Sequence, residues 1–371
     1  MSERFVSTVP PVLHPVQIML INAAIFFGHY VIISTALNFQ FGNAGIPNMS
    51  SNVSVAMGAY TVSALIVRIC MWIGEQMGLL FKPNWVYDNP YNTRLITNLF
   101  QQKPLLGTSI FVLSLALAFV LGSTTGWLIG AISGRLRATR LMILLLIISS
   151  AVSNIAANNE GIAGGTLGAF IPNPFTWYQG EQMVILATVI LSVGLVCFFI
   201  MRAMMNSPFG RLMRAVRENE VSLESTGKNV AMVRREVMMF GSGIMALSGV
   251  LLSYYYSFVQ HTMYDRMSYT FWPWLMITIG GLGNNAGAYI GTLVCVSIIK
   301  ALNISKQTLG PLLIGTMWIK LIGYFEDIIL STLLLVFLIF KPGGLVPEKI
   351  LMIKGVNYRQ IIRGEEEPRR P

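Results

Sequence analysis

Charged side chains are scarce in this chain: Asp, Glu, Lys and Arg together make up 11% of its 371 residues, while 54% are hydrophobic. Soluble domains carry roughly 25% of charged residues. A chain with so little charge cannot cover a large surface that faces water, so the composition excludes a large soluble domain and predicts a membrane protein. The net charge of +10 would suggest nucleic acid in a soluble protein. Here we expect no nucleic-acid partner, because in a membrane protein the positive loops set the orientation in the bilayer.

Cysteine and histidine are also scarce, with three of each. The cysteines lie inside apolar runs and are far apart in the sequence: Cys70, Cys197 and Cys295. We expect them to be packing residues, because neither a metal cluster nor a disulfide framework has this spacing. The histidines are isolated and show no ligand spacing: His14, His29 and His261. The sequence therefore predicts no metal site, no cofactor and no catalytic residue.

The phosphate-binding pattern Gly-x-x-x-x-Gly-Lys-Ser/Thr is absent from the sequence. The chain is therefore not expected to hydrolyse ATP by that route, and we expect it not to be an enzyme. A membrane enzyme would need clustered His, Asp or Glu at membrane depth. A secondary carrier usually places ionisable residues inside its spans, whereas most of those here lie near the predicted span ends. A passive channel remains open as an alternative.

Long apolar runs dominate the sequence. Runs of about 20 residues are needed to cross a bilayer as helices, and we place them near 16–38, 53–73, 106–130, 140–157, 183–203, 237–258, 270–283, 286–304 and 319–340. The glycine-rich segment 280–287 interrupts the run 270–304, which is either two short spans or a hairpin that does not fully cross. We expect an all-α fold, a single transmembrane domain over 1–371 with about 8–10 spans and with broken or re-entrant segments.

Basic residues mark the cytoplasmic side of a membrane protein. The segment 202–235 and the tail from Lys341 carry seven Lys or Arg residues each, whereas 158–182 carries none. We therefore expect 131–140, 204–236 and the tail 341–371 in the cytoplasm, and 158–182 outside. The segment 74–105 would be an external loop. Both chain ends are expected in the cytoplasm.

The segment 39–52 is rich in glycine, asparagine, serine and proline. Irregular backbone at membrane depth is tolerated only where it is buried in protein or lines a cavity. Two interpretations stay open. The segment is either a broken or re-entrant stretch inside the protein or an ordinary cytoplasmic loop.

One charged segment, which we call the island (residues 207–229), stands between two apolar spans. Ser207 and Pro208 suit the start of a helix, and Gly227 suits its end. Charges at helical spacing predict the pairs Arg214–Glu218 and Arg217–Glu220. Leu212, Ala215, Val216 and Leu223 form an apolar stripe. We expect an amphipathic helix that docks on a soluble partner at the membrane surface.

These segments resemble the permease subunits of branched-chain amino-acid ABC importers. The resemblance covers the Gly-Arg-x-x-Arg-Ala-x-Arg-Glu-Asn-Glu run at 210–220 with the Gly-x-Asn at 227–229, the Gly-Gly-Leu-Gly at 280–283 and the Lys-Pro-Gly-Gly-Leu at 341–345. It also covers the segments 42–60 and 159–164. The matches follow the family's order along nearly the whole chain. The chain departs from the family in two respects, because Ser51 stands where the family usually carries a histidine and the segment 74–105 is longer than usual.

The resemblance implies a multi-pass protein of a prokaryotic plasma (inner) membrane. Its implied partners are two cytoplasmic ATP-binding subunits, a second permease chain, identical or homologous, and an extracytoplasmic substrate-binding protein. Residues expected to couple to an ATPase are Arg211, Arg214, Arg217, Glu218, Glu224 and Gly227. Residues expected on the translocation path are Gly45, Asn48, Ser50, Gly280 and Gly283. The implied cargo is a branched-chain amino acid. Urea, an amide, a sugar or a nucleoside stays open, as does a secondary carrier or channel.

Overall fold

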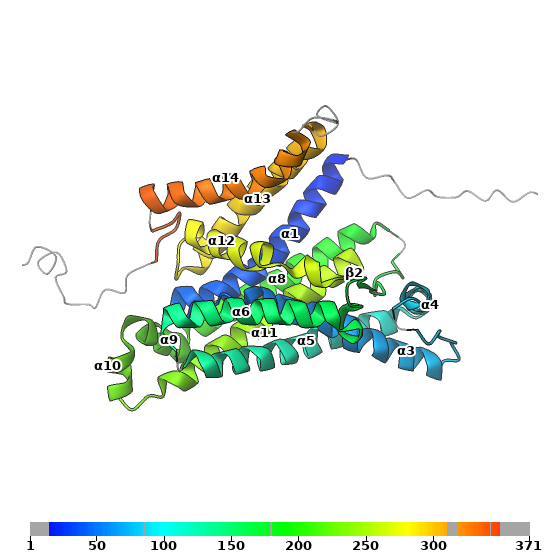
Figure 1. Ribbon diagram of the computed structural model, residues 1–371, viewed down its shortest axis with the longest axis horizontal. Helices are drawn as coiled ribbons and strands as arrows, with labels where there is room; N and C mark the ends of the chain where they lie inside the picture. The colour runs from blue at the N-terminus through cyan, green and yellow to red at the C-terminus, as the bar shows by residue number, and fades with distance from the viewer. Residues whose placement is uncertain are drawn as a thin grey trace, which may run out of the picture.

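The computed structural model describes residues 15–84, 86–134, 136–178, 180–309, 318–341 and 343–348, with the backbone alone at 15, 305–309 and 318–327. The chain is helical almost throughout (Figure 1). Its elements are α1 (Pro15–Leu37), η1 (Asn38–Asn43), α2 (Ser51–Thr61), η2 (Val62–Ile66), α3 (Val67–Gln76), α4 (Asn89–Gln102), α5 (Pro104–Ser133), α6 (Ala138–Asn158), α7 (Glu160–Ala163), β1 (Ala169–Phe170), α8 (Gln182–Asn206), α9 (Pro208–Glu218), α10 (Glu220–Ser225), α11 (Val230–Tyr256), β2 (Phe258–Val259), η3 (His261–Tyr264), η4 (Met267–Phe271), α12 (Trp272–Gly280), α13 (Asn285–Leu309) and α14 (Trp318–Phe340). The only strands in the described part are the antiparallel pair β1 and β2. The expected all-α fold is confirmed.

Seven helical segments among the described residues are long and apolar enough to cross a bilayer: Val16–Asn43, Ser51–Gln76, Pro104–Ser133, Ala138–Asn158, Gln182–Asn206, Val230–Tyr256 and Asn285–Ile304. The chain is therefore a multi-pass membrane protein. The expected span at 319–340 corresponds to α14. The expected span at 270–283 is shorter than a span, because η4 and α12 together are only about 21 Å long at 1.5 Å per residue. The run 270–304 thus combines a segment too short to cross with a helix, α13, that is long enough to cross, so neither the two short spans nor the hairpin that does not fully cross describes it.

The centre of the bundle is formed by α2 and α11, whose spans are 72% and 83% buried. The two helices cross at glycines. A Cβ atom at Gly58 would overlap the carbonyl oxygen of Ala246, and one at Gly249 would overlap that of Val55. Small residues at such crossings let helix backbones touch, which is the usual source of packing energy between helices in a membrane. α5 packs along α11 through glycines of its own.

The first helix runs parallel to α8. Gly28 of α1 lies against Ile190, and the Nδ2 atom of Asn43 lies 3.6 Å from the sulfur of Met205 near the end of α8. Because α8 leads into the island, α1 must begin at the opposite end of the bundle (Figure 1). The chain ends themselves, 1–14 and 349–371, lie outside the described residues. The neighbouring segment 343–348 lies beside the island, whereas the start of α1 lies at the opposite end of the bundle. The reason is that 39–52 turns the chain next to the island, so α1 and α2–α3 alternate as ordinary spans.

The segment 39–52 is largely buried within the protein, as the broken-segment interpretation expects, yet it connects two spans on the island's side, as the loop interpretation expects. The helix α1 continues as the wider turn η1, and an irregular stretch of seven residues then precedes α2. Most of these residues are buried, including Pro47 and Asn48. Irregular backbone is tolerated there because neighbouring groups satisfy it. Trp274 of α12, for example, donates its indole N–H to the carbonyl of Asn48 at 3.0 Å.

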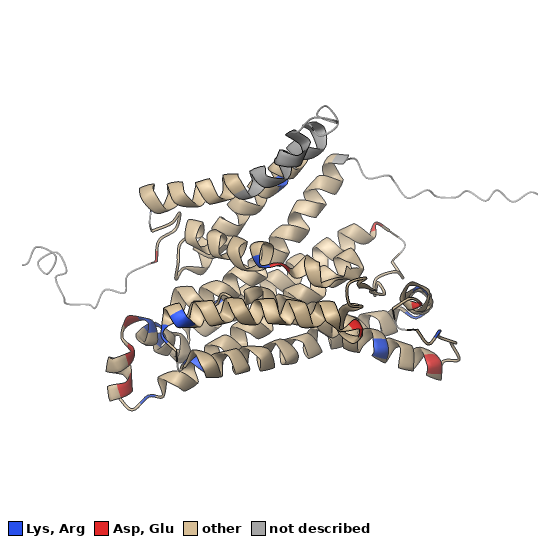
Figure 2. Cartoon of the chain, in the orientation of Figure 1, with Lys and Arg blue, Asp and Glu red and all other residues tan. Residues whose placement is uncertain are grey.

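The end of the bundle away from the island is more ordered than expected, since 74–105 is not a loop but contains α4. Pro90 near the start of α4 suits a helix N-terminus, and Ile96, Leu99 and Phe100 form its buried stripe. Thr93 of α4 donates to the carbonyl of Phe170 in β1. Figure 2 shows that most acidic and basic residues gather at the two ends of the bundle, as a membrane requires.

Candidate functional site

The island folds as two helices rather than one. The first, α9, has its buried residues at helical spacing: Gly210, Met213 and Val216. The opposite face exposes Arg211 and Glu218. The apolar stripe expected from the sequence is therefore shifted by one position, because Met213 is fully buried while Leu212 and Ala215 are half-buried. The amphipathic character itself is confirmed.

A break at Asn219 separates α9 from α10. Its backbone is extended, and its side-chain oxygen accepts the N–H of Ser222 at 3.0 Å, which caps α10. Asparagine is among the best N-cap residues, so it competes with continuation of the helix. Gly227 ends α10 with a φ of +78°, as expected. Ser207 precedes α9, but its hydroxyl donates back to the carbonyl of Met204 in α8.

The island's charged groups pair with distant segments and not with one another. Arg217 forms an ion pair with Glu348 at 2.8 Å, and its other guanidinium nitrogen donates to the carbonyl of Gly42. Glu220 pairs instead with Arg234 of α11. Arg214 donates to the carbonyl of Met205 at 3.4 Å. The expected pair Arg217–Glu220 is wrong, because the break at Asn219 separates the two residues and each has a longer-range partner. The expected pair Arg214–Glu218 is wrong as well, although both residues lie on α9, because Arg214 turns to the carbonyl of Met205.

Two of the glycines expected on the translocation path lie beside this ion pair. Gly283 has a φ of +78°, and a Cβ atom there would lie 2.7 Å from the carboxylate of Glu348. Its N–H donates to the side chain of Asn38 at 2.9 Å. Gly45 has a φ of +70° and lies against the side chain of Arg217. We call this group (Asn38, Gly42, Arg217, Gly283 and Glu348) the junction, because it brings together the end of α1, the island, the α12–α13 turn and the segment 343–348.

The third of these glycines, Gly280, serves close packing. A Cβ atom there would overlap the carbonyl of Gly287 in α13. The segment after α14 completes this turn, since Leu345 and Val346 donate their N–H groups to the carbonyls of Ile279 and Gly280 at 2.8 and 2.9 Å. The end of α12 is thus clamped by the segment that carries Glu348.

The remaining path candidates, Asn48 and Ser50, are buried in a hydrogen-bonded network separate from the junction. Asn48 donates to Gln40 at 2.8 Å and accepts from the backbone and hydroxyl of Ser50 at 2.8 and 2.9 Å. Gln40 donates to the carbonyl of Met238 in α11. Because these polar groups satisfy one another, they hold the break in α1 in one shape.

The ion pairs and hydrogen bonds that attach the island to the bundle, such as Arg217–Glu348, involve its inner face and not its outward face. The outward face exposes acidic, basic and apolar side chains in alternation: Arg211, Glu218, Val221, Glu224 and Lys228. Val221 is 75% exposed and lies between the exposed Glu218 and Glu224 in the sequence. Charge of both signs around an exposed apolar residue is a pattern that suits a protein partner.

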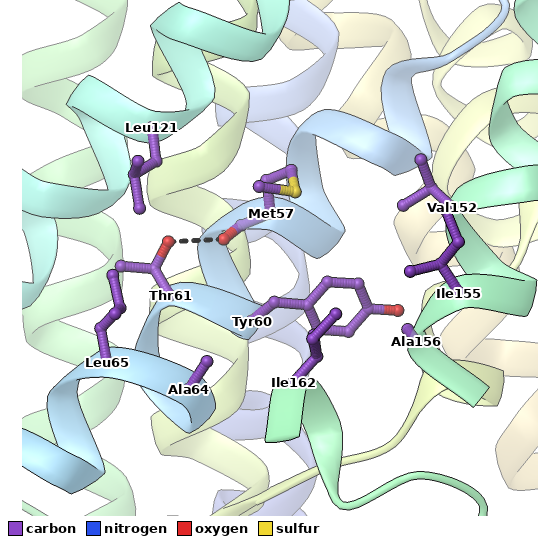
Figure 3. A pocket seen from close by; sticks show the side chains of 10 residues that line it. All are labelled: Met57, Tyr60, Thr61, Ala64, Leu65, Leu121, Val152, Ile155, Ala156 and Ile162. Carbon is purple, nitrogen blue, oxygen red and sulfur yellow. Dashed lines mark hydrogen bonds between the residues drawn. The ribbon is translucent and has the colours of Figure 1, made fainter. Parts of the chain in front are cut away.

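Two cavities flank α6. An apolar cavity of about 310 Å³ lies between α2, η2, α5 and α6 (Figure 3). Its threonine, Thr61, already donates to the carbonyl of Met57. A polar cavity of about 330 Å³ lies on the other flank, between α6, Asn52 and residues 264–266. The rings of Tyr60 and Tyr264, which line the two cavities, meet edge to face at 6.0 Å.

Within the described residues, no three His, Cys, Asp or Glu side chains gather closely enough to hold a metal ion. The three cysteines are free and buried, as expected of packing residues.

Sequence reasoning missed several residues that build the junction and the network. Glu348, Asn38 and Gln40 carry no motif, and only tertiary structure brings them to Arg217 and Asn48. One signal was present: Glu348 lies shortly after the Lys-Pro-Gly-Gly-Leu segment at 341–345, whose glycines predict a tight turn.

Known proteins resemble this chain over most of its length. The family described as "Branched-chain amino acid transport system / permease component" matches residues 19–338. A probable branched-chain amino acid transport permease protein LivM of Methanocaldococcus jannaschii is 33% identical over 329 residues, 88% of this chain and 92% of that protein. High-affinity branched-chain amino acid transport system permease proteins LivM of Salmonella typhimurium and Escherichia coli are each 21% identical over 258 residues, 63% of this chain and 56% of theirs. No solved structure matches.

Proposed function

The chain belongs to the family of permease components of branched-chain amino acid transport systems, and we propose that its own cargo is a branched-chain amino acid. It is a multi-pass permease subunit of the ATP-binding cassette importer type. In this proposal it works in the plasma membrane of a prokaryote as a single transmembrane domain over 1–371, and it takes its energy from ATP hydrolysed by two partner subunits in the cytoplasm. A second permease chain and an extracytoplasmic binding protein complete the importer.

The observation that carries this proposal is the two-sided island. The segment 204–236 is the coupling segment: the outward face of α9 and α10 presents Arg211, Glu218 and Glu224 to an ATPase. The inward face ties Arg217 to the junction. A push on the outward face is therefore passed to the end of α1 and to the α12–α13 turn, because packed interiors transmit displacement.

The roles of the individual residues follow from their places. Arg211, Glu218 and Glu224 contact the ATPase, and Gly227 ends α10 so that the chain can enter α11. Arg214 and Arg217 face inward and pass the movement on. Gly45, Gly280 and Gly283 shape the turns that move, whereas Asn48 and Ser50 hold the buried break near the cargo. The tail 341–371 lies on the cytoplasmic side.

Uptake by the complete importer tests the function. The four kinds of subunit are reconstituted in vesicles with ATP inside, and uptake of labelled leucine, urea and a ribonucleoside is compared. We expect leucine to enter, with isoleucine and valine competing. If only urea or the nucleoside enters, the cargo is wrong while the importer class stands. If leucine enters without ATP and follows an ion gradient, the chain is a secondary carrier and the importer class is wrong.

A further inference from the structure

The polar cavity beside α6 lies well inside the bilayer. Ser149 lies about 16 Å from the start of α6, near the middle of a helix that is about 31 Å long. Its hydroxyl donates to the side-chain oxygen of Asn52 at 2.9 Å. The amide nitrogen of Asn52 in turn lies 3.4 Å from the carbonyl of Tyr264. Through these bonds Tyr264 lies close to Ser149, and the next residues, Asp265 and Arg266, lie near the middle of α6 as well.

Charged side chains at this depth cost free energy unless water hydrates them or an opposite charge pairs with them. Both Asp265 and Arg266 are exposed on the chain and line the cavity. Asp265 has a structural role, since its Oδ2 atom accepts the N–H groups of Met267 and Ser268 at 2.9 and 3.2 Å and caps η4. Arg266 has no such role: across the described part of the chain, its guanidinium makes no hydrogen bond or ion pair.

The rest of the cavity wall is also polar. One flank of α6 contributes Ser150, Ser153 and Asn154, each a residue that lipid-facing helices rarely expose. The other flank of the same helix is apolar and lines the cavity of Figure 3. The helix therefore separates a polar cavity from an apolar one, and we expect a wall of this polarity to face water or protein rather than lipid.

We propose that this polar cavity opens to the water-filled cargo path and that Arg266 binds the carboxylate of the amino acid as it passes. The inference rests on the proposed amino-acid cargo. A guanidinium holds a carboxylate with two parallel hydrogen bonds, and the Asp265 carboxylate and the serine hydroxyls suit the ammonium group on the same cargo. Asp265 and Arg266 thus supply one charge of each sign, which is what a zwitterion needs from its binding site.

The first test asks whether water reaches the cavity. The native cysteines are buried, so single cysteines placed on α6 report their own surroundings. In the assembled importer, Ser150→Cys should react with a water-soluble methanethiosulfonate, and leucine should slow the reaction. Ile147→Cys is the matched control on the same helix, because Ile147 is 59% exposed but lies outside the cavity. Equal resistance at both positions would show that the cavity is not part of an aqueous path.

The second test removes the guanidinium. In vesicles, Arg266→Gln should lower leucine uptake about ten-fold or more, the usual cost of losing a hydrogen bond to a charged group. Arg266→Lys should retain part of the uptake, and Arg94→Gln, an exposed arginine of α4, should retain all of it. Arg266→Cys should recover after modification with an aminoethyl reagent and not with a sulfonatoethyl reagent, a difference that a purely structural role would not produce.

These outcomes separate the two proposals. If the wild-type importer does not carry leucine, the proposed cargo fails. If it carries leucine and Arg266→Gln does so at the same rate and KM, the role of Arg266 fails while the proposed function stands. If both charged reagents restore Arg266→Cys equally, Arg266 has a structural role only.

Discussion

Arg217 of α9 and Glu348 form an ion pair at 2.8 Å although 131 residues separate them in the sequence. Their side chains are 28% and 31% exposed, so solvent screens the pair only in part. The same arginine donates to the carbonyl of Gly42. One side chain of the island thus contacts both the end of α1 and the segment that clamps α12. Loss of this contact should uncouple the island from the transmembrane helices.

The first prediction concerns this ion pair. Arg217→Ala or Glu348→Ala should lower ATP-driven leucine uptake by about an order of magnitude, although a partly exposed pair contributes only about 0–1 kcal/mol to stability. The amount of chain in the membrane should therefore stay close to wild type. The measurement is uptake per assembled complex in vesicles. Lys82→Ala is the control, because Lys82 pairs with Asp88 outside the junction.

A charge swap makes this prediction sharper. Arg217→Glu combined with Glu348→Arg should recover part of the uptake that either single change loses, since the attraction survives with its sign reversed. Recovery is expected to be incomplete, because the swap leaves the carbonyl of Gly42 without its guanidinium donor. If the double variant is no better than the worse single variant, the pair does not couple these segments.

The second prediction concerns the outward face of the island. Glu218→Ala should reduce both uptake and the ATPase activity stimulated by cargo, with the chain still assembled in the membrane. Glu218 makes no ion pair in the described residues, so a large effect has to come from a partner. Glu75→Ala is the control, an exposed acidic residue at the end of α3, which lies at the opposite end of the bundle. Wild-type behaviour of Glu218→Ala would contradict docking through this residue.

The sequence was sufficient to predict the features that depend on composition and on the helical spacing of apolar residues. Apolar runs located the spans, and Pro208 and Gly227 located the two ends of the island. The density of glycine and asparagine at 39–52 indicated a break, and the structure encloses that break in protein. Each of these features depends on residues that lie close to one another in the sequence.

What the sequence could not predict depends on distant contacts. Local spacing favoured an Arg217–Glu220 pair, but Glu348 and Arg234 offered better geometry once the helices were packed. The start of α1 was assigned to the wrong end because the few charges near it gave no signal, and only its packing against α8 fixes its direction. Arg266 falls between the expected spans 237–258 and 270–283, and nothing in the local sequence shows that it lines a cavity beside α6.

The third prediction concerns the break in the island. Asn219→Ala removes the side chain that caps α10, which should cost about 1 kcal/mol of local stability. Hydrogen exchange of the backbone amides at 222–225 should become about five-fold faster, since that free energy corresponds to roughly this factor. Asn219→Asp keeps an accepting oxygen and should exchange at the wild-type rate. Unchanged exchange in Asn219→Ala would show that the cap does not hold α10.

The fourth prediction concerns topology. In intact cells, an impermeant thiol reagent applied from outside should label cysteines at 17 and 170 and leave a cysteine at 219 unlabelled. The reason is that α1 begins at the end of the bundle where β1 lies, opposite the island (Figure 1). Permeabilised cells provide the control, because position 219 should then react. Protection of 17 with labelling of 170 would place the start of α1 on the island's side after all.

The last prediction concerns the crossing of α2 and α11, on which the whole bundle depends. Gly58→Ala adds a methyl group where the carbonyl of Ala246 already lies, so the helices must separate. Overpacking of this kind costs about 1–3 kcal/mol, which exceeds the gain of about 0.5–1 kcal/mol that alanine brings to a helix interior. Thermal unfolding in detergent should therefore occur several degrees lower. Gly194→Ala is the matched control in a span: the nearest atom to its Cβ would be 3.2 Å away, so a shift of a few tenths of an ångström accommodates it. If both variants unfold at the wild-type temperature, the two helices do not pack as closely as this crossing requires.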